Sequence, residues 1–164
     1  MHADDVRLFF DYNYWANRQI LAAAAQLPRA DLTKPATFTW RNLQDTLLFA
    51  LDVERSWRGR LRGEPKEVWD ASLRAENYPT LADVAEHWAR DEQEMRAWLG
   101  GLDDRSLSSV VDLGGKDRFP LWFFLLHILT HSAQQRRDAV LLLKEVGRKP
   151  PELDFLYYAD HLQG

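Results

Sequence analysis

Hydrophobic residues recur at helical spacing in four long segments of the chain, which predicts four amphipathic helices. The first segment covers about residues 3–27 and stops before a proline. Its apolar stripe includes Asn13 and Asn17, and we expect these amides to bond to neighbouring backbone because buried polar groups need partners. The second segment covers about residues 40–61. Its inward positions step by three and four along the chain, and they are Trp40, Leu43, Leu47, Leu51, Glu54, Trp57 and Leu61.

The third segment covers about residues 80–99 and ends at two glycines. Thr80, followed three residues later by Asp83, resembles a capping box and marks the start of the helix. Asp91 is the one carboxylate in the apolar stripe of this segment. We expect it to face an arginine from another helix, because an unpaired buried charge is unfavourable; exposure to a wet cleft is the alternative.

The fourth segment covers about residues 120–146. Pro120 suits the first position of a helix, where its missing N–H has no partner to lose, and Gly147 suits the C-terminal cap. A short β-rich stretch followed by two glycines, at residues 110–115, predicts a small hairpin before this helix.

These elements predict an all-α fold, a four-helix bundle with a short C-terminal helix over about residues 152–161. The links on either side of the third helix are long enough to cross the bundle, so an alternating up-down order is not required. The chain has 164 residues, of which 46% are hydrophobic. We therefore expect residues 1–164 to form a single domain with a substantial core.

Charge and composition exclude several classes of function. A net charge of -4 argues against nucleic-acid binding, which needs a clustered basic surface. Near the end of the second helix, cations suit the negative end of the helix dipole. We interpret the arginines there as a solvated face, and they are Arg55, Arg58, Arg60 and Arg62. The chain has no cysteine, which excludes a disulfide scaffold, a thiolate zinc site and a cysteine nucleophile.

The sequence carries no pattern typical of secretion or of a membrane span. Its first residues include early acids and lack the basic start and the cleavage site of a secretory signal. The longest strongly apolar stretch, residues 119–129, is interrupted by Pro120 and His127 and is too short to cross a bilayer. We therefore expect a cytoplasmic protein without a membrane partner.

Polar residues interrupt the fourth helix at regular intervals. His127 and His131 are four residues apart, a spacing that suits one divalent ion if another helix supplies a third ligand. The alternative is a pair of bundle histidines with ordinary hydrogen bonds. The helical phase places His131, Gln135 and Asp138 in the core-facing row, which predicts a polar cleft or a hydrogen-bond network at mid-helix.

Four stretches of the chain resemble the DinB/YfiT-like superfamily, damage-inducible four-helix-bundle proteins that include metal-dependent thiol S-transferases. Their order and spacing match over nearly the whole chain, and they are residues 12–17 (YNYWAN), 52–57 (DVERSW), 127–132 (HILTHS) and 147–156 (GRKPPELDFL). The resemblance implies a homodimer and a divalent metal, zinc or nickel, held by two histidines of the fourth helix and one of the second.

Histidine occupies only part of the ligand set that the resemblance implies. The fourth-helix pattern of the family is His-x-x-Asn-His-Ser-Thr-x-His-Arg-Gly-Gln, which places one ligand at His131 and the next at Gln135. Counting back from Glu54 and Trp57 in the second helix places the third ligand at Phe49. A phenyl ring does not coordinate a cation, and a glutamine oxygen is a poor ligand for zinc or nickel.

We therefore predict a degenerate metal site without a cofactor, in which His131 is a remnant ligand and His127 a candidate helper. Phe49, His131, Gln135 and Asp138 would then line a cleft for a small molecule in a non-catalytic, stress-related protein. The alternative function is a thiol-dependent S-transferase, either metal-assisted or with His131 as general base oriented by Gln135 or Asp138. The thiol would come from a cosubstrate. Seven tryptophans, more than one small core usually needs, also favour a homodimer.

Overall fold

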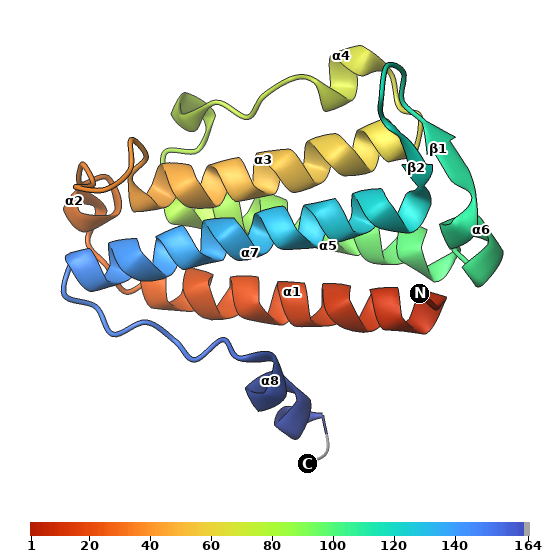
Figure 1. The fold of residues 1–164 in the computed structure, drawn as a ribbon. Coiled ribbons are helices and arrows are strands. Elements are labelled where there is room, and N and C mark those ends of the chain that lie inside the picture. The colour runs from red at the N-terminus through yellow and green to blue at the C-terminus, as the bar shows by residue number, and fades with distance from the viewer. Residues whose placement is uncertain (163–164) are drawn as a thin grey trace.

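The structure is a computed structural model that describes residues 1–162. Four long helices form a bundle, as expected from the hydrophobic pattern, and the predicted all-α fold is confirmed (Figure 1). The strands found in the described residues form one two-stranded hairpin. The four bundle helices are α1 (Ala3–Ala24), α3 (Leu43–Leu61), α5 (Leu81–Gly100) and α7 (Leu121–Glu145).

Each bundle helix packs against two neighbours. Helix α7 contacts α1 and α3, and α5 contacts the same two helices from the other side. Helices α3 and α5 run in the same direction, opposite to α1 and α7 (Figure 1). The link between α3 and α5 therefore returns along the length of the bundle, and it contains α4 (Lys66–Trp69) and the short 3-10 helix η1 (Ala75–Asn77).

The start of α3 differs from the prediction. The periodic pattern placed Trp40 on the inner face of this helix, but the helix begins at Leu43 and the Trp40 side chain is 82% exposed. The cause is Asn42, whose side chain accepts a hydrogen bond of 2.8 Å from the backbone N–H of Asp45 and so caps the helix. The preceding link contains the short helix α2 (Arg29–Leu32).

Other predicted helix ends agree with the structure to within a few residues. Thr80 and Asp83 form the expected capping box at the start of α5. Helix α7 begins at Leu121, with Pro120 as its N-cap rather than its first residue. Gly147 follows the end of α7 with a φ of 76°, which glycine adopts without strain.

The predicted hairpin is confirmed just before α7. Strands β1 (Val110–Asp112) and β2 (Arg118–Pro120) pair antiparallel, with Val111 opposite Phe119. The turn between them needs positive φ at Gly114 and Gly115. A short helix, α6 (Asp104–Ser108), leads into β1. Because β2 runs directly into α7, the hairpin lies at the end of the bundle where α7 begins (Figure 1).

The predicted C-terminal helix is α8 (Phe155–His161), which lies against the outside of α1 (Figure 1). The carboxylate of Asp154 caps it by accepting a hydrogen bond from the N–H of Leu156. Tyr12 of α1 connects the two helices. Its ring meets that of Phe155 edge to face at 5.2 Å between centroids, and its hydroxyl donates a 2.6 Å hydrogen bond to the carbonyl of Leu153.

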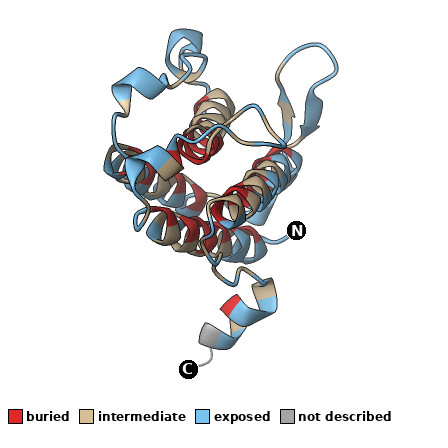
Figure 2. Ribbon diagram, turned by 90° about the vertical axis from the view of Figure 1, so that its left-hand side faces the viewer, coloured by how far each residue is buried: buried red, intermediate tan, exposed pale blue. Residues whose placement is uncertain are grey.

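The core consists of two hydrophobic clusters, one toward each end of the bundle. The first is built around Leu47, Leu51 and Leu143, and the second around Phe10 and Ile128. Buried residues face inward on all four long helices (Figure 2). Among the helices described, none is both long and apolar enough to span a membrane.

Candidate functional site

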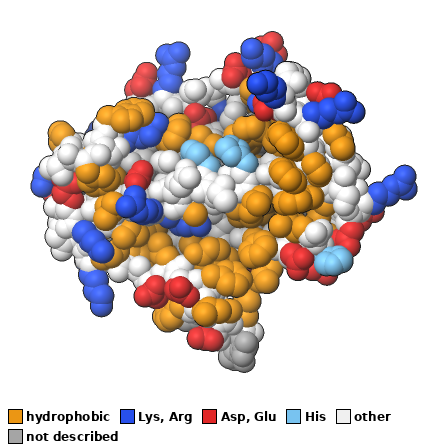
Figure 3. Space-filling view, in the orientation of Figure 1, with side chains coloured by type: hydrophobic (Ala, Val, Ile, Leu, Met, Phe, Trp, Pro, Cys, Tyr) orange, Lys and Arg blue, Asp and Glu red, His pale blue; other side chains and the backbone are white. Residues whose placement is uncertain are grey.

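His127 and His131 contact aromatic rings of α3. The Phe49 ring meets the His131 imidazole edge to face, with 5.4 Å between ring centroids. The Trp57 ring meets His127 in the same manner at 4.9 Å, and the centroids of the two imidazoles lie 6.4 Å apart. We call these four side chains the histidine cluster. On the face formed by α3 and α7, Figure 3 shows two adjacent histidine side chains beside hydrophobic ones.

An arginine that the sequence analysis did not single out lies at one end of the histidine cluster. The Cζ atom of Arg41 is 3.6 Å from the ring centroid of Phe49 and 3.7 Å from that of Trp40, a close cation–π arrangement. Burial lowers the pKa of the Arg41 guanidinium, although the carboxylates of Asp138 and Asp45 act against that shift. Arg41 therefore brings a positive charge next to the phenyl ring of the cluster.

This charge affects the protonation of His131. Burial lowers the pKa of the His131 imidazole, and the neighbouring charges of His127 and Arg41 lower it further. The imidazole of His131 is therefore neutral at pH 7, because its pKa lies below the ordinary value of 6.5.

The predicted inward row of α7 is correct at both ends of the helix, where Leu121, Phe124, Ile128 and Leu142 are buried, but it is displaced by one residue in the middle. His131, Gln135 and Asp138 were expected to point into the core, but all three are half-buried. The buried positions are the next residues along the chain, Ser132, Arg136 and Ala139. The predicted polar row thus lies along the edge of α7, and the structure brings Phe49 and His131 together while Gln135 and Asp138 lie further along the same edge.

A buried polar layer lies between the two hydrophobic clusters, where the bundle helices meet. The carboxylate of Glu54 accepts hydrogen bonds from the Tyr14 hydroxyl and, at 3.3 Å, from the Asn13 amide. The guanidinium of Arg136 donates to the amide oxygens of Asn13 and Asn17. The expectation that these asparagines bond to neighbouring backbone was therefore wrong, because a buried arginine of α7 uses their oxygens instead.

Glu54 has an unusual protonation equilibrium for a carboxylic acid. Burial raises its pKa from the ordinary 4.5 to about 8, and the nearby carboxylate of Asp91 adds to the rise. The hydrogen bonds from Tyr14 and Asn13 and the charge of Arg136 act in the opposite direction but do not outweigh burial. Glu54 is 1% exposed and lies on the inner face of α3, so it belongs to the core.

The family of this protein is shown by a match over nearly the whole chain. The family model described as the DinB family matches residues 1–163. The chain belongs to the DinB family. No curated protein matches the sequence closely enough to add a relative. Residues 1–162 of this DinB protein thus have the bundle that the resemblance implied, and the open question is what its histidine cluster does.

The residues of this DinB protein do not fit the metal that the family resemblance implies. Of the three ligand positions, one is the phenyl ring of Phe49 and another the neutral amide of Gln135. The remaining ligand, His131, packs against that phenyl ring. Within residues 1–162, no three histidine, aspartate or glutamate side chains gather in an arrangement that could hold a metal ion. We therefore derive no chemistry from a bound metal.

Two open pockets flank the histidine cluster. One, of about 340 Å³, is lined by Trp57 and His127 together with residues of the hairpin and the start of α7. The other, of about 330 Å³, is lined by Arg41 and Phe49 and by residues of the link after α4. Both volumes fall in the range of roughly 300–1,000 Å³ that is typical of small-molecule sites.

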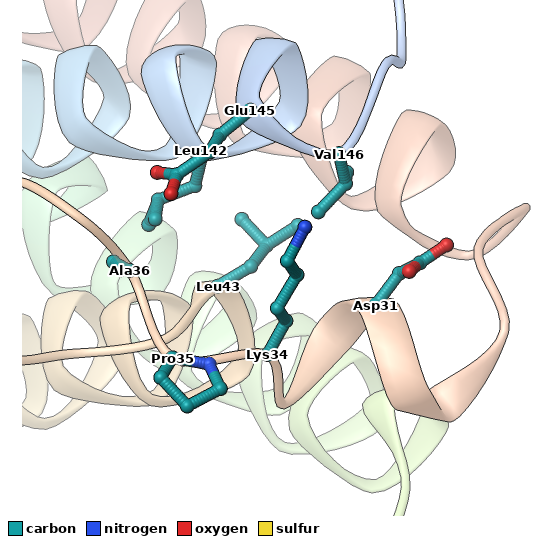
Figure 4. A pocket seen from close by; sticks show the side chains of 8 residues that line it. All are labelled: Asp31, Lys34, Pro35, Ala36, Leu43, Leu142, Glu145 and Val146. Carbon is teal, nitrogen blue, oxygen red and sulfur yellow. The ribbon is translucent and has the colours of Figure 1, made fainter.

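A third cavity, at the end of the bundle near α2, is too small for a ligand. The side chain of Leu43 points toward α7 there, next to Lys34 (Figure 4). The space has a volume of about 10 Å³, which is at the lower limit for a single water molecule. The residues that line it are Asp31, Lys34, Pro35, Ala36, Leu43, Leu142, Glu145 and Val146.

Asp91 pairs with an arginine, as predicted from its place in an apolar stripe. Its carboxylate accepts a hydrogen bond from the guanidinium of Arg58, and both side chains are buried. The interpretation of the α3 arginines as a solvated face was therefore wrong for Arg58. Arg55 contacts the link that contains α4, where it donates a 2.9 Å hydrogen bond to the carbonyl of Val68. The place of Asp91 in an apolar stripe signalled such pairing, but the sequence does not show which arginine meets it.

Proposed function

We propose that this DinB protein is a single-domain, non-catalytic protein that binds a small molecule at the histidine cluster, in place of a metal site that it has lost. The observation that carries this proposal is the contact between Phe49 and His131, at 5.4 Å between ring centroids. It joins two of the positions where the family resemblance implies metal ligands. At one position the apolar ring of Phe49 replaces the ligand, and this ring covers the imidazole of His131 at the other.

Arg41 supports the same conclusion. A guanidinium stacked on Phe49 places a fixed positive charge beside the remnant ligand, and that charge helps to keep the His131 imidazole unprotonated. A divalent cation at this position would be repelled by the same charge at close range. The arrangement favours aromatic or polar organic groups over metal ions.

The metal content of the purified protein tests this proposal. The protein should be prepared without a polyhistidine tag and analysed for zinc, nickel, cobalt and manganese by mass spectrometry. We expect far less than one equivalent of any of them per chain after dialysis. One tightly held equivalent of zinc or nickel would overturn the proposal.

The alternative is a thiol-dependent S-transferase with His131 as general base. The lowered pKa of the His131 imidazole favours it, because a neutral imidazole accepts a proton at pH 7. Against it, neither Gln135 nor Asp138 forms a hydrogen bond with His131 in the described part of the chain, so nothing found there orients the base. Turnover of an electrophile with a small thiol that is lost in His131→Ala but kept in the surface variant Glu86→Gln would favour this alternative.

We also propose that the protein forms a homodimer through the exposed side of α1 and α7. Phe9 of α1 and Leu126 of α7 are large apolar side chains that remain exposed. They border an apolar groove that also includes Leu129 and Ala133. Hydrophobic side chains gather over these helices in Figure 3, and a contiguous apolar surface of this kind is typical of an interface.

A further inference from the structure

The pocket on the hairpin side of the histidine cluster is walled almost entirely by aromatic rings. It has a volume of about 340 Å³ and lies between α3, β2 and α7. It adjoins the cluster through His127, whose ring centroid is 6.4 Å from that of His131. The residues that line it are Trp57, Asp117, Phe119, Phe123, Phe124 and His127.

Two of these rings are held parallel and left open to solvent. The planes of Phe119 and Phe123 differ by 4°, with 5.4 Å between centroids, and the two side chains are 41% and 43% exposed. Phe119 belongs to β2, and Phe123 lies in the first turn of α7. Behind them, Phe124 meets Phe119 edge to face and stacks on Trp57 at 5.8 Å. A flat ring placed here would bury apolar surface that the protein alone leaves in water.

The charged groups of this pocket offset one another. Arg60 lies 3.9 Å from the carboxylate of Asp117 and donates a 3.3 Å hydrogen bond to the carbonyl of Leu113. Its guanidinium also lies 5.2 Å from the ring centroid of Trp57. The carboxylate of Asp117 thus has an opposite charge beside it, which favours a neutral ligand, and the imidazole of His127 is the other polar side chain among the lining residues.

We propose that this pocket binds a neutral, planar aromatic molecule of one or two fused rings that carries one hydrogen-bonding group. The rings lie against Phe119 and Phe123, and the polar group bonds to a ring nitrogen of His127. Since it names the ligand class of the histidine cluster, this inference rests on the proposed function.

Indole is a suitable probe, because it is flat, neutral and has one N–H donor. Binding is followed by calorimetry and ligand-observed NMR on the full chain, with tryptamine as the cationic arm and indole-3-acetate as the anionic arm. We expect saturable binding of indole with a dissociation constant below about 1 mM, reasonable for so small a ligand, and weaker binding of both charged compounds. Absence of indole binding, or tenfold tighter binding of either charged compound, would overturn the proposal.

Variants locate the binding site. Phe123→Ala should weaken indole binding at least fivefold, whereas Phe38→Ala, which removes a similarly exposed ring outside the pocket, should not change it. His127→Leu should weaken indole but not its sulfur isostere benzothiophene, which lacks the N–H group. Equal affinity of indole for wild type and Phe123→Ala would contradict the assignment, provided that circular dichroism shows both to be folded.

The test of indole binding and the test of metal content can fail independently of each other. If the protein holds no metal and indole does not bind, the ligand class is wrong while the loss of the metal site stands. If the protein holds one equivalent of metal, the proposed function fails whatever the result with indole.

Discussion

The guanidinium of Arg58 donates a hydrogen bond to the carboxylate of Asp91, and this pair joins α3 to α5 inside the bundle. The two side chains are only 6% and 1% exposed. Each charge therefore depends on the other, because neither is solvated enough to be stable alone. A second carboxylate, that of Glu94, receives a 2.5 Å hydrogen bond from the same guanidinium closer to the surface.

Removal of Arg58 should strongly destabilise the protein. We expect Arg58→Ala to lower the free energy of unfolding by about 3–5 kcal/mol, because it leaves the buried carboxylate of Asp91 unpaired. Arg90→Ala is the matched control. Arg90 pairs with Glu86 on the surface of α5, and its loss should change the free energy by less than about 1 kcal/mol. Urea unfolding measures both, and similar small losses would contradict the buried pair.

Glu54 should make stability depend on pH in a direction opposite to that of most carboxylates. Its pKa is about 8 in the folded protein and 4.5 as its ordinary value, so the folded state holds more protons between these limits. The stability contributed by Glu54 is therefore greatest below about pH 4.5 and is lost as the pH rises toward 8, by at most about 1.4 kcal/mol per pH unit.

The variant Glu54→Gln isolates this effect, because its side chain does not titrate. The free energy of unfolding of the wild type minus that of Glu54→Gln should fall steadily between pH 5 and 8. The surface variant Glu86→Gln provides the control and should give a nearly constant difference over this range. A difference that is flat or rises with pH for Glu54→Gln would show that Glu54 is ionised in the folded protein.

The corrected phase of α7 predicts contrasting effects for two substitutions on that helix. The contacts found for the half-buried His131 ring are with other rings, so His131→Leu should change stability by less than about 1 kcal/mol. Arg136→Leu removes the donor on which the oxygens of Asn13 and Asn17 depend and should lower the free energy of unfolding by at least about 2 kcal/mol. A larger loss of unfolding free energy for His131→Leu than for Arg136→Leu would show instead that His131 is the residue that faces the core.

The proposed dimer makes a prediction about mass. Light scattering on the wild type at tens of micromolar should give about twice the 19.2 kDa of one chain. Leu126→Glu should give a monomer, because it places a charge in the apolar side of α7. Val68→Glu alters a similarly exposed apolar residue of α4 and should leave the dimer intact. A monomeric wild type would refute the proposal.

Local sequence signals predicted the elements that depend on neighbouring residues. Thr80 and Asp83 form their capping box within one turn of helix. Gly114 and Gly115 adopt the positive φ of the hairpin turn, which depends on these residues alone and not on distant contacts. The pairing of Asp91 with an arginine was also predictable in kind, because burial of a charge demands an opposite one.

The phase of α7 and the position of Arg41 could not be predicted in this way. Helix α7 carries apolar residues on more than one face, including the exposed Leu126, so the periodic pattern fits two orientations. Arg41 precedes the Asn42 cap, and only the tertiary contact of α3 with α7 brings its charge close to His131. Long-range contacts of this kind leave no trace in spacing or composition.

We propose that Phe49 and Gln135 stand in place of two metal ligands. The double variant Phe49→His with Gln135→His tests it by supplying three imidazoles together with His131. Each single variant supplies only two, so the gain in affinity should be strongly non-additive. Adding Arg41→Gln to the double variant should strengthen binding further, because it removes a positive charge beside the ion.

Calorimetric titration of the untagged wild type, both single variants and the double variant with zinc is the most direct measurement. We expect weak or absent binding by the wild type and by each single variant. The double variant should bind one equivalent, with about 2.7 kcal/mol of added stability at a hundredfold excess of zinc over the dissociation constant. Tight binding of one equivalent by the wild type, or a folded double variant that gains no affinity with or without Arg41→Gln, would contradict the loss of the metal site through Phe49 and Gln135.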